Sequence, residues 1–197
     1  MELLSLRAQR FRNLFPQRLE FAPGFNLVTG DNGQGKTNLL EAVAVLTSLR
    51  SFRTANHRRL VQHGETAYNL DGQFQRHGDT MRLDQEVAVG PPLQREIRVD
   101  GRSVAVARYL STAPVVALTP SDRTLVAGEP SVRRAFLDRF AFLLEPAMYD
   151  DVRLYRRALR QRNAWIASGA DDRILAAFEV VLAQSAAAVV ERRRRAL

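Results

Sequence analysis

The sequence predicts an α/β fold followed by an α-helical arm. Apolar residues recur at every second position between residues 67 and 99, which is typical of strands with one buried face. A glycine-rich stretch at residues 30–37 separates a short apolar run from an amphipathic segment, as a loop between a strand and a helix does. From Pro120 onward the pattern is helical almost throughout. These boundaries divide the chain into residues 1–119 and residues 120–197.

Short strands are predicted before the glycine-rich stretch. Residues Leu3 to Phe11 alternate between apolar and polar, and two further strands are expected at Leu19 to Phe21 and at Phe25 to Thr29. After the stretch, residues 38–49 are predicted to form a helix that packs on the sheet. The residues expected on its packed face are Leu39, Leu40, Val43, Leu46 and Thr47, while Glu41 is expected to be solvated.

The middle of the chain is predicted to be an antiparallel meander. Turns at residues 77–79, 90–92 and 100–101 separate its strands. A helix at residues 104–110 and a buried strand at residues 114–118 are expected to follow. The residues expected on the buried face of the meander are Tyr68, Leu70, Gly72, Phe74, Met81, Leu83, Gln85, Val87, Val89, Ile97 and Val99.

The arm is predicted to contain three helices. Pro130 and Pro146 mark the starts of two of them, and a polar break at residues 168–171 precedes the third, at residues 172–197. Two long helices joined by a short turn are expected to run antiparallel. The last residues still have helical character, so we expect this sequence to be truncated within the arm.

The glycine-rich stretch matches the phosphate-binding pattern of glycine, four residues, then Gly-Lys-Ser/Thr, as Gly30-Asp31-Asn32-Gly33-Gln34-Gly35-Lys36-Thr37. Its glycines let the backbone wrap around a polyphosphate, and the N–H groups of the following helix attract the anion. Lys36 is the only lysine in this arginine-rich chain and is predicted to reach the β- and γ-phosphates. Thr37 is predicted to place its hydroxyl on Mg²⁺.

Hydrolysis would need a second carboxylate at the end of an apolar strand to hold the metal shell. The two candidates are Asp100, which falls in a hairpin turn, and Asp122, which follows the predicted strand at 114–118 after a gap and a proline. Neither position suits the role. We therefore expect no catalytic residue in this sequence, which should bind nucleotide without hydrolysing it.

Composition narrows the class of partner. A net charge of +8 and a pI near 11 favour an anionic partner, with nucleic acid as the first candidate, although arginine-rich usage raises the pI whatever the role. The absence of cysteine excludes disulfides and thiol chemistry, and the three histidines lack metal-ligand spacing. Since no run of about 20 apolar residues occurs, a cytoplasmic protein without membrane association is expected.

Five blocks of the sequence occur in a recognisable order: Phe11-Arg12-Asn13 and residues 32–42, 50–54, 128–138 and 155–163. Together they resemble the RecF family of bacterial recombination and repair ATPases. The resemblance implies the first lobe of an ABC-type head, similar to that of structural-maintenance-of-chromosomes (SMC) proteins, with slow DNA-stimulated ATP hydrolysis by the complete site. It further implies ATP-dependent homodimers, binding to single-stranded or gapped DNA, and recombinase loading with partner mediator proteins. The signature loop and the metal-shell acid would lie beyond Leu197.

The same resemblance extends the expected sites. ATP is expected to contact Arg12, Asn13 and Asn38 as well as residues 30–37, although residues 12–13 could equally form a plain turn. DNA contacts are expected at Arg50 and Arg53, and on one helix face at Arg153, Arg156 and Arg160. Salt bridges within the lobe, or a solvated helix face, would explain these arginines without DNA.

Two alternatives from other classes remain open. The chain could be a DNA-binding or interaction module with a vestigial nucleotide loop, which its high pI and arginine-rich arm would suit. An unrelated P-loop kinase is also conceivable, but the meander and the long helical hairpin argue against it.

Overall fold

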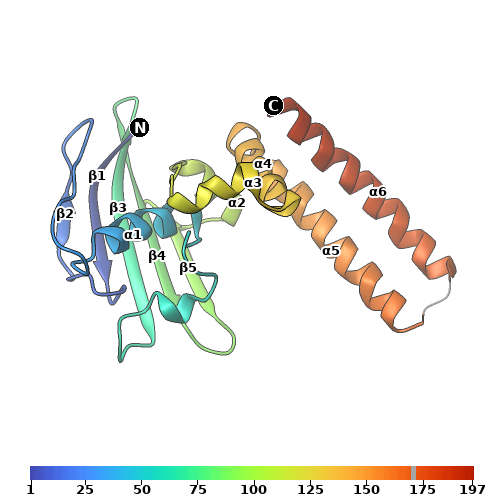
Figure 1. Ribbon diagram of the computed structural model, residues 1–197, viewed down its shortest axis with the longest axis horizontal. Helices are drawn as coiled ribbons and strands as arrows, with labels where there is room; N and C mark the ends of the chain where they lie inside the picture. The colour runs from blue at the N-terminus through green and yellow to red at the C-terminus, as the bar shows by residue number, and fades with distance from the viewer. Residues whose placement is uncertain (170–171) are drawn as a thin grey trace. The chain divides into compact units, whose positions relative to one another are not determined.

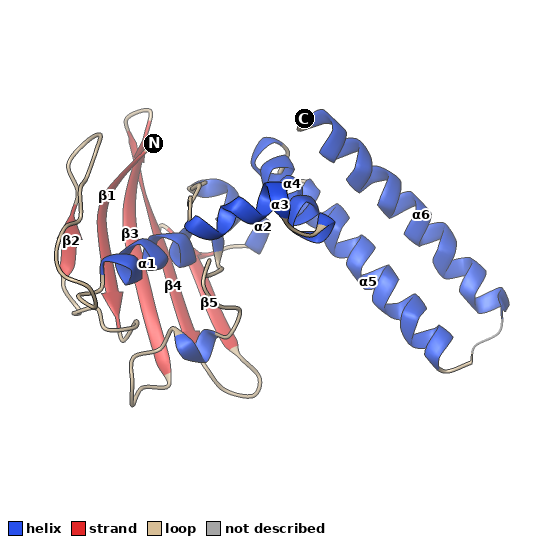
Figure 2. Cartoon of the chain, viewed as in Figure 1, coloured by secondary structure: helices blue, strands red, loops and turns tan. Residues whose placement is uncertain are grey.

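The chain folds as a sheet unit, Met1–Thr119, followed by a helical unit, Pro120–Leu197 (Figure 1). The computed structural model describes residues 1–169 and 172–197. The polar break predicted at residues 168–171 therefore lies partly outside the described residues. The predicted α/β class with a helical arm is confirmed (Figure 2).

Six strands form one antiparallel sheet in the order β2-β1-β3-β4-β5-β6. The predicted meander is confirmed, because β3, β4 and β5 are antiparallel neighbours joined by the short connections 77–78 and 89–93. Alternate residues on these strands are buried, as their period-two pattern predicts. The bounds are β1 Glu2–Gln9, β2 Arg18–Glu20, β3 Ala67–Arg76, β4 Asp79–Ala88, β5 Gln94–Val99 and β6 Arg102–Ser103.

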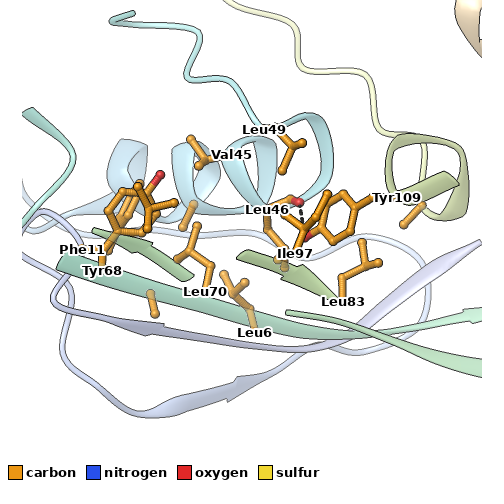
Figure 3. Packing of buried hydrophobic residues seen from close by; sticks show 14 of the residues in the cluster. Leu6, Phe11, Val45, Leu46, Leu49, Tyr68, Leu70, Leu83, Ile97 and Tyr109 are labelled. Atoms are coloured by element: carbon orange, nitrogen blue, oxygen red, sulfur yellow. Dashed lines mark hydrogen bonds between the residues drawn. The ribbon is translucent and has the colours of Figure 1, made fainter. Parts of the chain in front are cut away.

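Two helices, α1 (Lys36–Ser48) and α2 (Val106–Thr112), cover one face of this sheet (Figure 2). Between helices and sheet lies an apolar core, in which the Tyr109 hydroxyl donates a 2.8 Å hydrogen bond to the carbonyl of Leu46 (Figure 3). A Cβ atom at Gly72 on β3 would lie 2.8 Å from Cδ2 of Leu46. Glycine at this position thus allows α1 to approach the sheet closely. A short 3₁₀ helix, η1 (His57–Arg59), lies between α1 and β3.

Two predicted strands are wrong. Residues 25–29 and residues 114–118 form no strand, and neither segment pairs with another in the part of the chain that the structure describes. Most of their apolar side chains are exposed, with Leu27 at 88%, Val116 at 70% and Leu118 at 87%. An apolar run favours a strand, but only a hydrogen-bonded neighbour makes one.

The packed face predicted for α1 is partly wrong as well. Ala42, Val45 and Leu46 are buried in the sheet-side core, whereas Leu40 is 59% exposed. Leu40 lies on another side of the helix, which the sheet does not cover.

The second unit contains η2 (Pro120–Arg123), α3 (Thr124–Ala127), α4 (Pro130–Leu144), α5 (Met148–Ala167) and α6 (Asp172–Arg195). The predicted antiparallel arrangement of α5 and α6 is confirmed by two ion pairs, Arg162–Glu179 and Arg192–Asp151. Near the end of α6, Arg192 also pairs with Glu145, and Arg193 pairs with Asp138 at 2.7 Å. Across the described ranges, no helix is both long and apolar enough to cross a membrane.

Candidate nucleotide site

The loop before α1 has backbone conformations that favour glycine. Gly30, Gly33 and Gly35 have φ values of 141°, 87° and 98°, which side chains disfavour. Gly35 is also crowded: a Cβ atom there would lie 3.0 Å from Oδ1 of Asn13. The chain can therefore curl tightly around an anion at this point only because these positions are glycine.

The N-terminus of α1 opens onto this loop. Its N-cap residue is Gly35, and no side chain in the described part of the chain caps the helix. The first N–H groups of an uncapped helix carry a partial positive charge and lack helical acceptors, so they suit a phosphate group. The side chain of Thr37, in the first turn, is exposed. Its hydroxyl is a chemically suitable ligand for Mg²⁺.

Lys36 brings a full positive charge to the same place. Its Nζ atom donates hydrogen bonds to the carbonyls of Gly30 and Asp31, at 2.6 and 2.7 Å, so the ammonium group lies over the loop. The loop is braced from within by Gln34, whose Oε1 accepts a 3.0 Å hydrogen bond from the N–H of Asp31. Ammonium group, glycine backbone and helix N-terminus together fit a polyphosphate.

A cavity of about 200 Å³ lies beside the loop. Its wall combines polar groups of Asn13, Gln34 and Lys36 with apolar side chains that include Leu39 and Phe15. Phe15 is 80% exposed. The cavity thus joins an apolar surface to the cationic end of the loop.

Asn13 and Asn38 lie beside the loop, together with the predicted phosphate-binding residues. Nδ2 of Asn13 donates a 3.0 Å hydrogen bond to the carbonyl of Gly33, and Oδ1 of Asn13 accepts one of 2.7 Å from Asn38. Arg12 is directed elsewhere. Its Nε and Nη2 atoms each donate a 2.9 Å hydrogen bond to the carboxylate of Glu41.

Glu41 contradicts the expectation of a solvated helix residue, because it is fully buried. Besides Arg12, its carboxylate accepts hydrogen bonds from the hydroxyl of Ser51 and from Arg53. One local signal was available: Glu41 lies one turn before Val45, which is buried in the core.

The predicted DNA-contact arginines fall into two groups. Arg53 lies next to the nucleotide loop and donates a 2.8 Å hydrogen bond to Oδ1 of Asn38, while Arg50 is exposed. Arg153, Arg156 and Arg160 are exposed on α5 in the second unit. Of these, Arg156 lies 3.9 Å from the carboxylate of Asp138.

The two carboxylates considered for the metal shell have other surroundings. Asp100 lies in the turn between β5 and β6 and accepts a 2.8 Å hydrogen bond from the N–H of Arg82. Asp122 belongs to η2 in the second unit. Within the described residues, no group of three His, Asp or Glu side chains could hold a metal ion.

His57, also in the first unit, contacts Arg95 and Tyr68. Nη2 of Arg95 lies 2.8 Å from Nε2 of His57, and the Tyr68 hydroxyl lies 2.9 Å from Nδ1. Because a guanidinium only donates, Nε2 must accept and the ring proton sits on Nδ1. Burial, and secondly the charge of Arg95, lower the pKa of His57, while burial raises the pKa of Tyr68. Both groups are thus neutral near pH 7.

Comparison with protein families and curated proteins gives consistent matches. The family model described as the RecF/RecN/SMC N terminal domain matches residues 2–110. The DNA replication and repair protein RecF of Anaeromyxobacter sp. (strain Fw109-5) is 42% identical over 195 residues, which cover 98% of this chain and 52% of that protein. The protein of the same name from Thermosynechococcus vestitus is 36% identical over 200 residues, with 99% and 52% covered. The chain spans about half the length of the curated relatives it matches.

Solved structures agree with these matches. The recombination mediator protein RecF in the RecFOR pathway, described as RecF-ATP, superimposes with a TM-score of 0.91 at 28% identity, over 98% of this chain and 53% of that one. A second solved structure comes from work on the ATP-driven dimerization and DNA-stimulated activation of SMC ATPases. It superimposes with a TM-score of 0.54 at 18% identity, over 70% of this chain and 98% of that one. The latter likeness concerns the fold alone.

Proposed function

Because the chain belongs to the RecF/RecN/SMC N-terminal domain family, we propose that it forms the ATP-binding part of a RecF-type DNA replication and repair protein. The observation that carries the proposal is the uncapped N-terminus of α1, with the ammonium group of Lys36 above it. The likeness to RecF-ATP over nearly the whole chain supports ATP as the nucleotide. In this proposal residues 30–38 and Asn13 bind ATP, and Thr37 binds Mg²⁺.

A titration with a fluorescent ATP analogue in the presence of Mg²⁺ tests the proposal. Lys36→Ala removes the only basic side chain within residues 30–37, so the affinity of the variant should fall at least about tenfold. Arg76→Ala, which removes an exposed charge at the end of β3, is the matched control and should bind as the wild type does. Equal affinities of wild type and Lys36→Ala would refute the assignment.

Hydrolysis is a separate proposal. Asp100 lies in the turn after β5, where it accepts a hydrogen bond from Arg82, and Asp122 lies in η2, so we propose that this chain by itself binds ATP and turns it over negligibly. Steady-state release of phosphate by the chain alone would overturn this.

We also propose that the RecF-type protein binds single-stranded or gapped DNA, acts as an ATP-dependent homodimer with mediator proteins, and works in the cytoplasm. The exposed arginines of α5 support a DNA contact. The carboxylate of Asp151, which is close to them in sequence, is occupied by Arg192, and Arg156 has only a long contact of 3.9 Å with Asp138. Arg50 and Arg53 are further candidates in the first unit.

Salt dependence tests the DNA contact on α5. If Arg153, Arg156 and Arg160 each neutralise a phosphate, changing all three to alanine should reduce the slope of log K against log salt by about 2 on single strands. Arg162→Ala, also on α5, removes an arginine that is paired with Glu179 of α6 and should leave the slope nearly unchanged. A triple variant with the wild-type slope would exclude this face. DNA binding by a protein that fails to bind ATP would instead favour a module with a vestigial loop.

A further inference from the structure

The carboxylate of Glu41 is buried and fully used as an acceptor. Oε1 accepts hydrogen bonds from Nη2 of Arg12 and from the Ser51 hydroxyl, and Oε2 accepts them from Nε of Arg12 and, at 3.4 Å, from Arg53. Two hydrogen bonds to each oxygen match the capacity of an ionised carboxylate. A buried charge is tolerated only when it is compensated in this way. Donors from Arg12, Ser51 and Arg53 therefore fix the position of the Glu41 carboxylate.

Ser51 links the carboxylate of Glu41 to the backbone of the segment that follows α1. Its hydroxyl donates its single proton to Glu41 and accepts hydrogen bonds from the backbone N–H groups of Arg53, at 2.9 Å, and Thr54, at 3.0 Å. A serine bonded to the next backbone amides defines a turn. The position of residues 51–54 thus depends on the carboxylate of Glu41.

From this turn a line of side chains leads back to the phosphate loop. Arg53 donates to Oδ1 of Asn38, Asn38 donates to Oδ1 of Asn13, and Asn13 donates to the carbonyl of Gly33, at 2.8, 2.7 and 3.0 Å. Each amide uses both ends, so its orientation is determined by its neighbours. Glu41 supports this line of hydrogen bonds, because its carboxylate accepts hydrogen bonds from Arg53 and from Ser51.

We propose that Glu41 is a positioning residue of the nucleotide site, which sets the loop geometry through Arg53, Asn38 and Asn13. The inference rests on the proposed ATP binding. Glu41 is not a catalytic residue, because its acceptor sites are occupied and its side chain is fully buried. Its role is to hold the asparagine pair against the loop so that the loop is ready to receive phosphate.

The variant Glu41→Gln tests the proposal in the full chain. Glutamine has the same size, but its NH₂ group would face donors of Arg12 or Ser51, so the turn and the asparagine line should lose their support. We expect the dissociation constant for a fluorescent ATP analogue to rise about tenfold. The titration is run at a temperature where circular dichroism shows each variant to be folded.

Asp71→Asn is the matched control. Asp71 on β3 is another buried carboxylate, 5% exposed, with two arginine partners, Arg18 at 3.5 Å and Arg82 at 3.4 Å. Both substitutions should lower the melting temperature, but only Glu41→Gln should weaken nucleotide binding. An equal loss of affinity in both variants would mean that Glu41 acts through stability alone and would overturn the proposal.

Two more variants keep the test decisive. Arg53→Ala should weaken binding in the wild type but add little to Glu41→Gln, because both changes break the same line of contacts. Ser51→Ala removes only the hydroxyl bridge and should raise the dissociation constant about threefold, even if Glu41→Gln fails to fold. Wild-type affinity in folded Glu41→Gln, or in Ser51→Ala, would refute the positioning role. If the wild type itself binds no more tightly than Lys36→Ala, the proposed function fails instead.

Discussion

Gln85 on β4 is a polar residue in an apolar setting. It is fully buried, and neither of its amide atoms has a hydrogen-bond partner within the residues that the structure describes. An unsatisfied buried amide costs about 1–3 kcal/mol. Gln85→Met keeps a similar shape without the polar atoms, so it should stabilise the protein by about 1 kcal/mol and raise the thermal midpoint measured by circular dichroism.

Gln94→Met, at an exposed position of β5, serves as the control and should give no comparable gain. A lower midpoint for Gln85→Met would show that the amide is hydrogen-bonded in the native protein.

His57 makes stability depend on pH. Its pKa is lowered in the folded state, first by burial and then by Arg95. The unfolded chain then binds more protons than the native one below about pH 6.5, so stability falls as the pH is lowered through that window. In His57→Gln, the drop in melting temperature between pH 7.5 and pH 5.5 should be smaller than in the wild type. His77→Gln, in an exposed turn, should keep the wild-type drop.

The role of a single residue can be predicted from the sequence in some cases and not in others. The chemistry of the loop is local, so Lys36 and the glycines were predicted together from eight consecutive residues. Glu41 could not be predicted in this way, since its partners Arg12 and Ser51 are 29 and 10 residues away along the chain. Only the folded arrangement of three separate segments makes that carboxylate a buried centre.

At the scale of elements, the strands of the meander were predictable because each is next in sequence to its hydrogen-bonding neighbour. Residues 25–29 and 114–118 have equally apolar sequences and yet form no strand. Local composition supplies the preference for an extended backbone, but pairing is a property of two segments. The exposure of Leu27 and Leu118 is the visible result.

Ion pairs and a small apolar cluster both hold the end of α6. Arg193 pairs with Asp138 on α4, and both side chains are largely buried, whereas Arg194 is 78% exposed and pairs only with Glu191 of its own helix in the part of the chain that is described. Arg193→Ala should therefore destabilise the helical unit by about 1 kcal/mol, and Arg194→Ala by less than about 0.5 kcal/mol, in urea unfolding followed by circular dichroism. Equal effects of the two substitutions would show that the interhelical pair contributes nothing specific.

At the scale of the whole molecule, the first unit leaves large apolar side chains exposed to solvent outside its core. Leu27 and Leu118 are each more than 85% exposed, on two separate segments of that unit. Exposed apolar patches bind hydrophobic dyes. The double variant Leu27→Ser/Leu118→Ser should therefore show weaker fluorescence of a bound naphthalenesulfonate dye, with an unchanged circular dichroism spectrum.

Leu154→Ser, on α5, removes another exposed leucine and is the control, with a smaller expected effect. Unchanged dye fluorescence in the double variant would show that these segments are covered in solution.

Lys36 is the only lysine of the chain, and this gives the loop a practical property. Reagents that acylate primary amines can modify only its Nζ atom and the amino terminus. Because that Nζ atom donates to two loop carbonyls, its reactivity reports on the loop itself. The extent of acylation, read by mass spectrometry on one peptide, would follow occupancy of the loop without any engineered label.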